Sequence, residues 1–250
     1  MVASNRGAFV RGVVAFVAAV VAIGSTFGGA TSALADTTTD SEPAHFLLHG
    51  GFDLWRNGGF GHGGLLWSPD GLTKEGFTLK LVLGAGTYRY RAGATEITGR
   101  QYLASALPGW RFKDGTIELT VFGGLDLQQH RFSPDDPANR LRGFDIGARG
   151  GFDLWFEPMP AALMVTTSVS ASTIGRNIWA RAAAGVRAFD LWLGPEGVYC
   201  GDETYRQLRF GAHITGLRTD IFEWSAGAGW VTDSDRRSGM YGRLGVLVRK

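Results

Sequence analysis

Residues 117–128 read IELTVFGGLDLQ, and apolar and polar side chains alternate along this stretch. Ile117 and Leu119 begin the apolar phase, whereas Glu118 and Asp126 lie on the polar phase. Successive side chains of a β-strand point to opposite faces, so a period of two residues is typical of a strand with two unlike faces. The stretch therefore predicts a strand with one apolar face and one polar face.

The same alternation recurs over residues 144–155 and 207–215 and continues from about residue 45 to the end of the chain. Glycine, tryptophan or tyrosine stands where the rhythm pauses, and no helical period separates the segments. Many consecutive strands without intervening helices are typical of antiparallel sheets that close on themselves. The sequence thus predicts an all-β fold, a closed antiparallel β-barrel.

The N-terminal segment has the features of an export signal. Arg6 and Arg11 precede an apolar run over residues 12–24, and Ala33-Leu34-Ala35 is a small-x-small cleavage motif. We predict that residues 1–35 are a signal peptide cut between Ala35 and Asp36. An uncleaved anchor is the alternative, but this run is shorter than the roughly 20 residues that a membrane helix needs.

After cleavage, we expect a periplasmic tail over residues 36–44 and an outer-membrane β-barrel over residues 45–250. Turn residues divide the barrel into about twelve strands, and ten is the alternative number. The expected strands are 45–56, 62–68, 76–91, 98–112, 116–131, 140–156, 161–174, 178–189, 191–200, 204–218, 221–232 and 239–249. Short links are expected to face the periplasm, and longer charged links the outside.

Charge and composition exclude several classes of protein. The chain has 25 basic and 23 acidic residues, and removal of Arg6 and Arg11 makes the two numbers equal. The mature chain therefore has no net charge and no basic footprint for a nucleic-acid partner. Cys200 is the single cysteine, so an intrachain disulfide is excluded. We attribute the 38 glycines to sharply curved barrel walls.

All eight tryptophans fall near proposed strand ends, which predicts two aromatic belts at the membrane interfaces. A soluble sandwich or lipocalin-like barrel with these rings in its core is the alternative. The motif Gly-Gly-Phe-Asp-Leu-Trp occurs at residues 50–55 and 150–155, and its last four residues recur at 189–192. A repeated strand design and chance in a biased composition both explain this similarity.

If the apolar phase faces lipid, the polar phase lines the barrel interior. The residues predicted to do so are Asp53, Glu118, Asp126, Asp145, Arg149, Asp153, Arg181, Arg187, Arg209, His213, Glu223 and Arg243. Both signs are abundant, so a self-neutralising network of salt bridges is one interpretation. A lining for a polar solute or polymer is the other.

The sequence contains no catalytic or cofactor motif, so we expect no enzyme activity, no cofactor and no metal site. The glycine-rich residues 58–64 lack a following helix and are interpreted as a surface connection. His130 and His213 lie on polar phases without a serine relay nearby and are expected to be structural or lumenal. Asp135, Asp136 and the pair Asp233 and Asp235 are interpreted as solvated loop residues.

Several motifs resemble the cellulose biosynthesis protein S (BcsS) family of alphaproteobacteria, over about residues 47–249. They are Glu75-Gly76-Phe77, Gly84-Ala85-Gly86-Thr87-Tyr88-Arg89-Tyr90, Pro108-Gly109-Trp110, Leu193-Gly194-Pro195-Glu196 and Tyr241-Gly242-Arg243-Leu244-Gly245-Val246. The resemblance implies a secreted outer-membrane barrel close to the machinery of cellulose production. It brings no catalytic signature.

By this resemblance, we expect a non-enzymatic barrel that assists cellulose biosynthesis, secretion or surface organisation. The expected partners are outer-membrane lipid and cellulose or components of the cellulose synthase and secretion complex. A small general porin is the first alternative. An outer-membrane lipid-modifying enzyme is the second, and the absence of a clustered serine, histidine and acid disfavours it.

Overall fold

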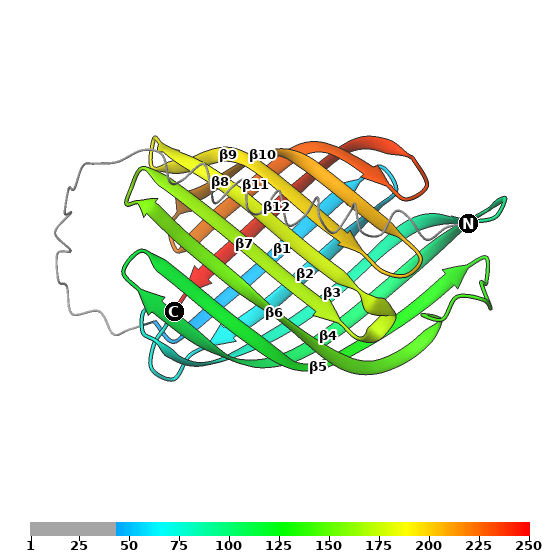
Figure 1. Ribbon diagram of the computed structural model, residues 1–250, viewed down its shortest axis with the longest axis horizontal. Helices are drawn as coiled ribbons and strands as arrows, with labels where there is room; N and C mark the ends of the chain where they lie inside the picture. Colours follow the sequence, from blue (N-terminus) through cyan, green and yellow to red (C-terminus); the bar gives the residue numbers. More distant parts are fainter. Residues whose placement is uncertain (1–43) are drawn as a thin grey trace.

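Residues 44–250, which a computed structural model of the chain describes, form twelve β-strands that close into one barrel (Figure 1). The predicted signal peptide, its cleavage site and the tail up to residue 43 lie outside the described residues. Each strand pairs antiparallel with its neighbour in sequence, and β1 pairs with β12 from Leu47↔Arg249 to Trp55↔Tyr241. Closure leaves no open edge, as a membrane-spanning sheet requires.

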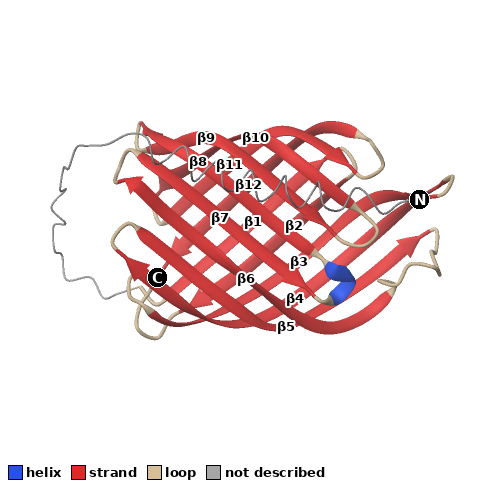
Figure 2. Ribbon diagram, viewed as in Figure 1, coloured by secondary structure: helices blue, strands red, loops and turns tan. Residues whose placement is uncertain are grey.

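The strand bounds agree with most of the predicted ranges. The strands are β1 Phe46–Trp55, β2 Gly58–Trp67, β3 Gly76–Ala92, β4 Thr95–Asp114, β5 Ile117–Ser133, β6 Gly143–Met159, β7 Leu163–Ser172, β8 Ile178–Ala188, β9 Leu191–Gly201, β10 Arg206–Thr219, β11 Phe222–Asp233 and β12 Ser238–Arg249. The predicted number of twelve is confirmed. In Figure 2 the helical element is a short turn, η1 Ile174–Arg176, between β7 and β8. No helix within residues 44–250 is long and apolar enough to cross a bilayer.

The prediction that residues 58–64 form a surface connection was wrong, because they belong to β2. Gly58 packs so closely against the carbonyl oxygen of Thr87 that a Cβ has no room. A Cβ on Gly64 would lie 2.5 Å from Nε2 of His49. The glycines let β2 approach β3 and the inward side chains of β1 closely, which is a known use of glycine within strands.

The two phases of the alternating pattern face opposite environments. On β6, Phe144 and Ile146 point outward and are 60% and 67% exposed. On the inward phase, Asp126 and Arg209 are 0% and 2% exposed. An apolar exterior around a charged, buried interior is the reverse of a soluble barrel. The alternative of a soluble sandwich or lipocalin-like barrel is therefore wrong.

The tryptophans divide evenly between the two faces, so the prediction that all eight form interfacial belts was wrong for four of them. Trp67, Trp110, Trp224 and Trp230 lie on the outward phase, and the last of these is 57% exposed. Trp55, Trp155, Trp179 and Trp192 lie on the inward phase. Proximity to a strand end gives depth in the membrane, but only the strand phase gives the face.

The repeated motif keeps its phase in its two complete copies. Asp53 and Asp153 both point inward, from β1 and β6. The partial copy differs, because Phe189 and Asp190 form the tight turn between β8 and β9 with φ of 51° and 62°. Two consecutive positive φ angles match the twist of a two-residue hairpin.

The barrel has two unlike ends. The terminal end carries Phe46 and Arg249, and the loop end is the opposite rim. The long strands are β3, β4, β5 and β6, with 17, 20, 17 and 17 residues against 10 in β1. By the usual orientation of bacterial barrels, we expect the terminal end in the periplasm and the loop end outside the cell.

Candidate lumenal site

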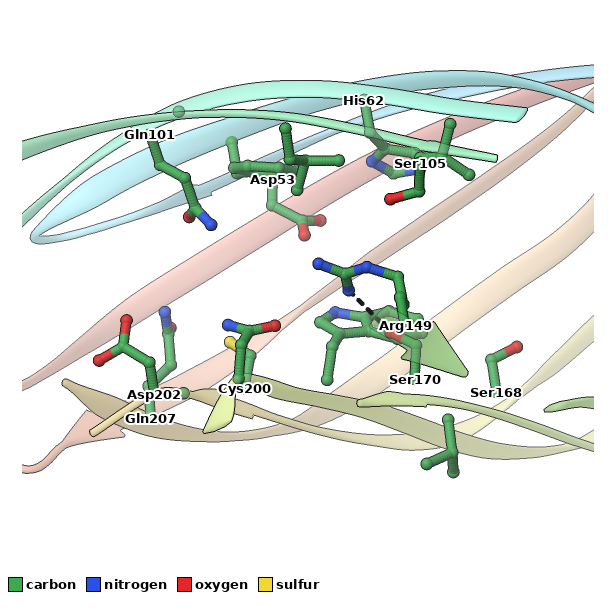
Figure 3. Close-up of a pocket in the computed structure, with 18 of the residues that line it drawn as sticks. Asp53, His62, Gln101, Ser105, Arg149, Ser168, Ser170, Cys200, Asp202 and Gln207 are labelled. Atoms are coloured by element: carbon green, nitrogen blue, oxygen red, sulfur yellow. Dashed lines mark hydrogen bonds between the residues drawn. The ribbon is translucent and has the colours of Figure 1, made fainter. Parts of the chain in front are cut away.

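A cavity of about 370 Å³ occupies the barrel interior. Figure 3 shows Asp53, His62 and Gln101 projecting into it from one wall, while Cys200 and Gln207 project from the facing wall. The aromatic rings in the lining are those of Trp55, Phe60, Tyr88, Phe122, Trp179 and Tyr205. Its size falls within the range of small-ligand sites, which combine apolar rings with a few polar groups.

Asp126 is at the centre of one buried polar network. Its carboxylate accepts two hydrogen bonds of 3.0 Å from Arg149, one of 2.7 Å from Ser105 and one of 2.7 Å from Gln128. Ser172 donates a further bond at 2.5 Å. The side chain is fully buried, so these donors replace its lost hydration.

Glu196 is at the centre of a second network. Its carboxylate lies 2.9 Å from Nη2 of Arg181 and 2.7 Å from Nη2 of Arg243. The hydroxyl of Tyr241 donates to the same carboxylate at 3.0 Å. Glu196 is fully buried, and both arginines are largely buried. One carboxylate therefore holds two guanidinium groups together, which would repel each other in its absence.

Other contacts cross the interior between strands that are not neighbours. Nζ of Lys80 on β3 lies 2.7 Å from Asp153 on β6 and 4.4 Å from the centre of the Phe122 ring. Arg209 on β10 lies 3.4 Å from Asp53 on β1, and its guanidinium lies over the ring of Trp55 at 4.7 Å. Each contact joins strands that stand three places apart in the closed barrel, so charged pairs project into the lumen.

Aromatic side chains meet inside the barrel towards the loop end. Tyr88, Tyr90, Ile97 and Tyr205 form a buried cluster, each at most 7% exposed. The rings of Tyr88 and Tyr205 stack at 5.7 Å, although one belongs to β3 and the other precedes β10. The cluster therefore joins opposite sides of the barrel.

Charged loop residues cover this cluster. Arg237 donates to Asp233 at 3.0 Å and to the backbone oxygen of Arg89 at 2.6 Å, and it lies 3.0 Å from Asp235. Asn57 donates to Asp233 at 2.9 Å. The interpretation of Asp233 as a solvated loop residue was wrong, because the carboxylate is buried and ties the β11–β12 loop to the barrel.

The twelve residues predicted to line the interior do not form one cluster. The predicted residues that form ion pairs inside the barrel are Asp53, Asp126, Arg149, Asp153, Arg181, Arg209 and Arg243. His213 lies 3.1 Å from the carbonyl oxygen of Ala184. Glu118, Arg187 and Glu223 lie near the terminal end with local partners. Asp145 lies on the inward phase of β6, and its Oδ2 has no hydrogen-bond partner among the described residues.

Sequence reasoning missed Glu196, Lys80, His49 and His62. The neighbours of Glu196 on its own phase include Trp192, Val198 and Cys200, so no polar alternation marks that strand. The charge itself was the available signal, since an unpaired carboxylate in the middle of a strand is costly on either face.

Within residues 44–250, neither His130 nor His213 makes a hydrogen bond to a serine or to an acidic side chain. His130 is buried and lies 3.0 Å from Oε1 of Gln128 and 3.5 Å from the hydroxyl of Tyr88. His213 lies 3.1 Å from the hydroxyl of Thr215. Within residues 44–250, no group of three histidine, cysteine or acidic side chains is placed to hold a metal ion.

A closed twelve-stranded barrel with an apolar exterior and a paired, charged interior defines the class of outer-membrane β-barrels. Comparison of the sequence with protein families then identifies the group within this class. The chain belongs to the cellulose biosynthesis protein BcsS family, which it matches over residues 47–250. This membership connects the chain with cellulose biosynthesis. A search of curated proteins found no match.

Solved structures with similar folds are outer-membrane barrels. The KdgM porin is 9% identical, with a TM-score of 0.46 over 81% of this chain and 98% of the porin. The translocator domain of the autotransporter NalP from Neisseria meningitidis is 14% identical, with a TM-score of 0.46 over 98% and 96%. LpxR from Salmonella typhimurium is 10% identical, with a TM-score of 0.47 over 81% and 99%.

Proposed function

We propose that this protein is a non-enzymatic accessory barrel that assists the secretion or surface organisation of cellulose. In this proposal, residues 1–35 direct export and are removed, residues 36–44 form a periplasmic tail, and the barrel inserts in the outer membrane. Its partners are cellulose or components of the synthase and secretion complex. Family membership supports the link with cellulose, and the fold supports the membrane location.

We propose that no glucan chain passes through the barrel, and the side-chain contacts inside the barrel are the observation that supports this. The Lys80–Asp153 and Arg209–Asp53 pairs project into the lumen, and the tyrosine cluster joins opposite sides of the barrel towards the loop end. A glucan chain would have to displace buried, hydrogen-bonded ion pairs, whose disruption is costly. The barrel therefore acts beside a separate export path, and its loop end is the surface that meets the extruded polymer.

The lumenal cavity offers chemistry for a short saccharide. Trp55 and Trp179 supply aromatic faces, and Gln101, Ser168 and Ser170 supply hydrogen-bonding groups. Sugars present both apolar C–H faces and hydroxyl groups, so rings combined with a few polar groups suit them.

Deletion of the gene is expected to remove most extracellular dye-binding glucan while glucan synthesis in inner-membrane preparations continues at the parental rate. The reason is that the barrel acts after polymerisation. The measurement is dye binding by whole cells, paired with incorporation of labelled glucose by isolated inner membranes. Unchanged surface cellulose in the deletion strain would contradict the proposal.

Conductance in a planar bilayer distinguishes a general porin, the first alternative, from the accessory barrel. The purified wild-type chain is expected to conduct little, because side chains cross its lumen. Steady conductance would favour the porin.

Full complementation of the deletion by the wild-type gene is the control for polar effects on neighbouring genes.

A further inference from the structure

Two arginines face each other without a counter-ion on the outside of the barrel. Arg100 on β4 and Arg131 on β5 are direct partners in the register, and both are exposed. Tyr102, the next outward residue on β4 after Arg100, is 46% exposed, so both arginines share the lipid-facing phase. Within residues 44–250 neither guanidinium has an ion pair or a hydrogen bond. Like charges directly opposite each other on adjacent strands are destabilising.

The neighbouring positions increase the positive charge. Thr87 pairs with Arg100 and Arg89 pairs with Thr98, so Arg89 occupies the diagonal position beside the arginine pair. Its partner Glu96 lies 3.9 Å away, and both side chains are about half exposed. An exposed pair at this distance gives little compensation. The outer face of β3, β4 and β5 therefore presents a basic patch near the loop end.

The surface directly below this patch is aromatic and then aliphatic. Tyr102 pairs with Gln129, and Gln129 pairs with Phe144 on β6. The next outward row contains Leu127 and Ile146. Phe144 and Ile146 are more than half exposed. An aromatic row marks the headgroup level of a membrane, and the aliphatic row below it marks the hydrocarbon.

We propose that Arg100 and Arg131 bind the phosphate of a phosphorylated glycolipid in the outer leaflet, with its acyl chains against Phe144 and Ile146. A phosphate placed between the guanidinium groups removes their repulsion and accepts charge-assisted hydrogen bonds from both. The vertical order of charge, aromatic ring and aliphatic side chain matches the order of phosphate, headgroup boundary and acyl chain. The inference depends on the outer-membrane location and is independent of the role in cellulose production.

The test measures binding of purified bisphosphorylated lipid A to the folded chain in detergent by native mass spectrometry. R100A/R131A is expected to weaken binding about tenfold or more, because charge-assisted hydrogen bonds from two groups are lost. R100K/R131K is expected to retain part of the affinity, since the charge stays but the bidentate geometry is lost. The matched control is R176A/R206A, which removes two exposed loop-end charges, one between β7 and β8 and one on β10, away from the patch.

Three results would overturn the proposal: unchanged affinity in R100A/R131A, an equal loss in R176A/R206A, or equal binding of fully dephosphorylated lipid A. The second result would indicate general charge attraction, and the third would indicate acyl contacts alone. A heated-versus-unheated gel shift confirms that each variant is folded before binding is measured. Because the assay uses no glucan, its outcome is separate from that of the deletion experiment.

Discussion

Glu196→Ala is expected to lower the free energy of unfolding by about 3 kcal/mol or more, which is typical for loss of one partner from a buried ion pair. The carboxylate is fully buried between Arg181 and Arg243. Its removal leaves two guanidinium groups close together without a counter-charge, and Tyr241 loses its acceptor. Urea titration of the barrel in lipid vesicles, followed by gel mobility, measures the change.

The matched variant replaces all three charged residues, Arg181, Glu196 and Arg243, by leucine. Replacement of a whole buried network by apolar side chains is often neutral, so this triple variant is expected to be more stable than Glu196→Ala. The account of this network would be contradicted if Glu196→Ala unfolded at the wild-type urea concentration. It would also be contradicted if the triple variant were the weaker of the two.

Leu125→Arg is expected to destabilise the barrel by about 2–4 kcal/mol, the cost of arginine at the bilayer midplane on a lipid-facing position. Leu125 is 48% exposed and lies near the middle of β5, next in sequence to the fully buried Asp126. The charge would therefore enter hydrocarbon and not the polar interior. The same urea titration in vesicles is the measurement.

Ala94→Arg serves as the control, because Ala94 is exposed in the turn between β3 and β4. The same side chain placed there should change stability by only a few tenths of a kcal/mol, as for most surface substitutions. Equal effects of the two substitutions would mean that Leu125 does not face hydrocarbon.

Most of the strands could be predicted from the alternation of apolar and polar residues. The predicted range 221–232 differs from the observed β11 Phe222–Asp233 by one residue at each end. Such strands were readable because a strand between lipid and a wet interior needs opposite chemistry on its two faces. The first half of β2 could not be predicted from the pattern. It is mostly glycine, which has no side chain to indicate which face of the strand is apolar.

The interior was less predictable than the strands. A phase identifies which side chains point inward, but pairing across the lumen depends on barrel closure and stagger. Asp53 and Arg209 are far apart in sequence, yet only β11 and β12 separate their strands in the closed barrel. Proximity to a strand end predicted membrane belts for all eight tryptophans, but four of them lie on the inward phase, because that proximity gives depth in the membrane and not the face of the barrel.

Lipid contact measured residue by residue along β6 tests the central claim most directly. Single cysteines replace Phe144, Asp145, Ile146 and Gly147 in a Cys200→Ser background, each carries a fluorescent label, and nitroxide-bearing lipids act as quenchers. The account predicts strong quenching at 144 and 146 and weak quenching at 145 and 147, since only the first pair faces lipid. The reverse pattern, or uniform quenching, would contradict an apolar exterior around a charged interior.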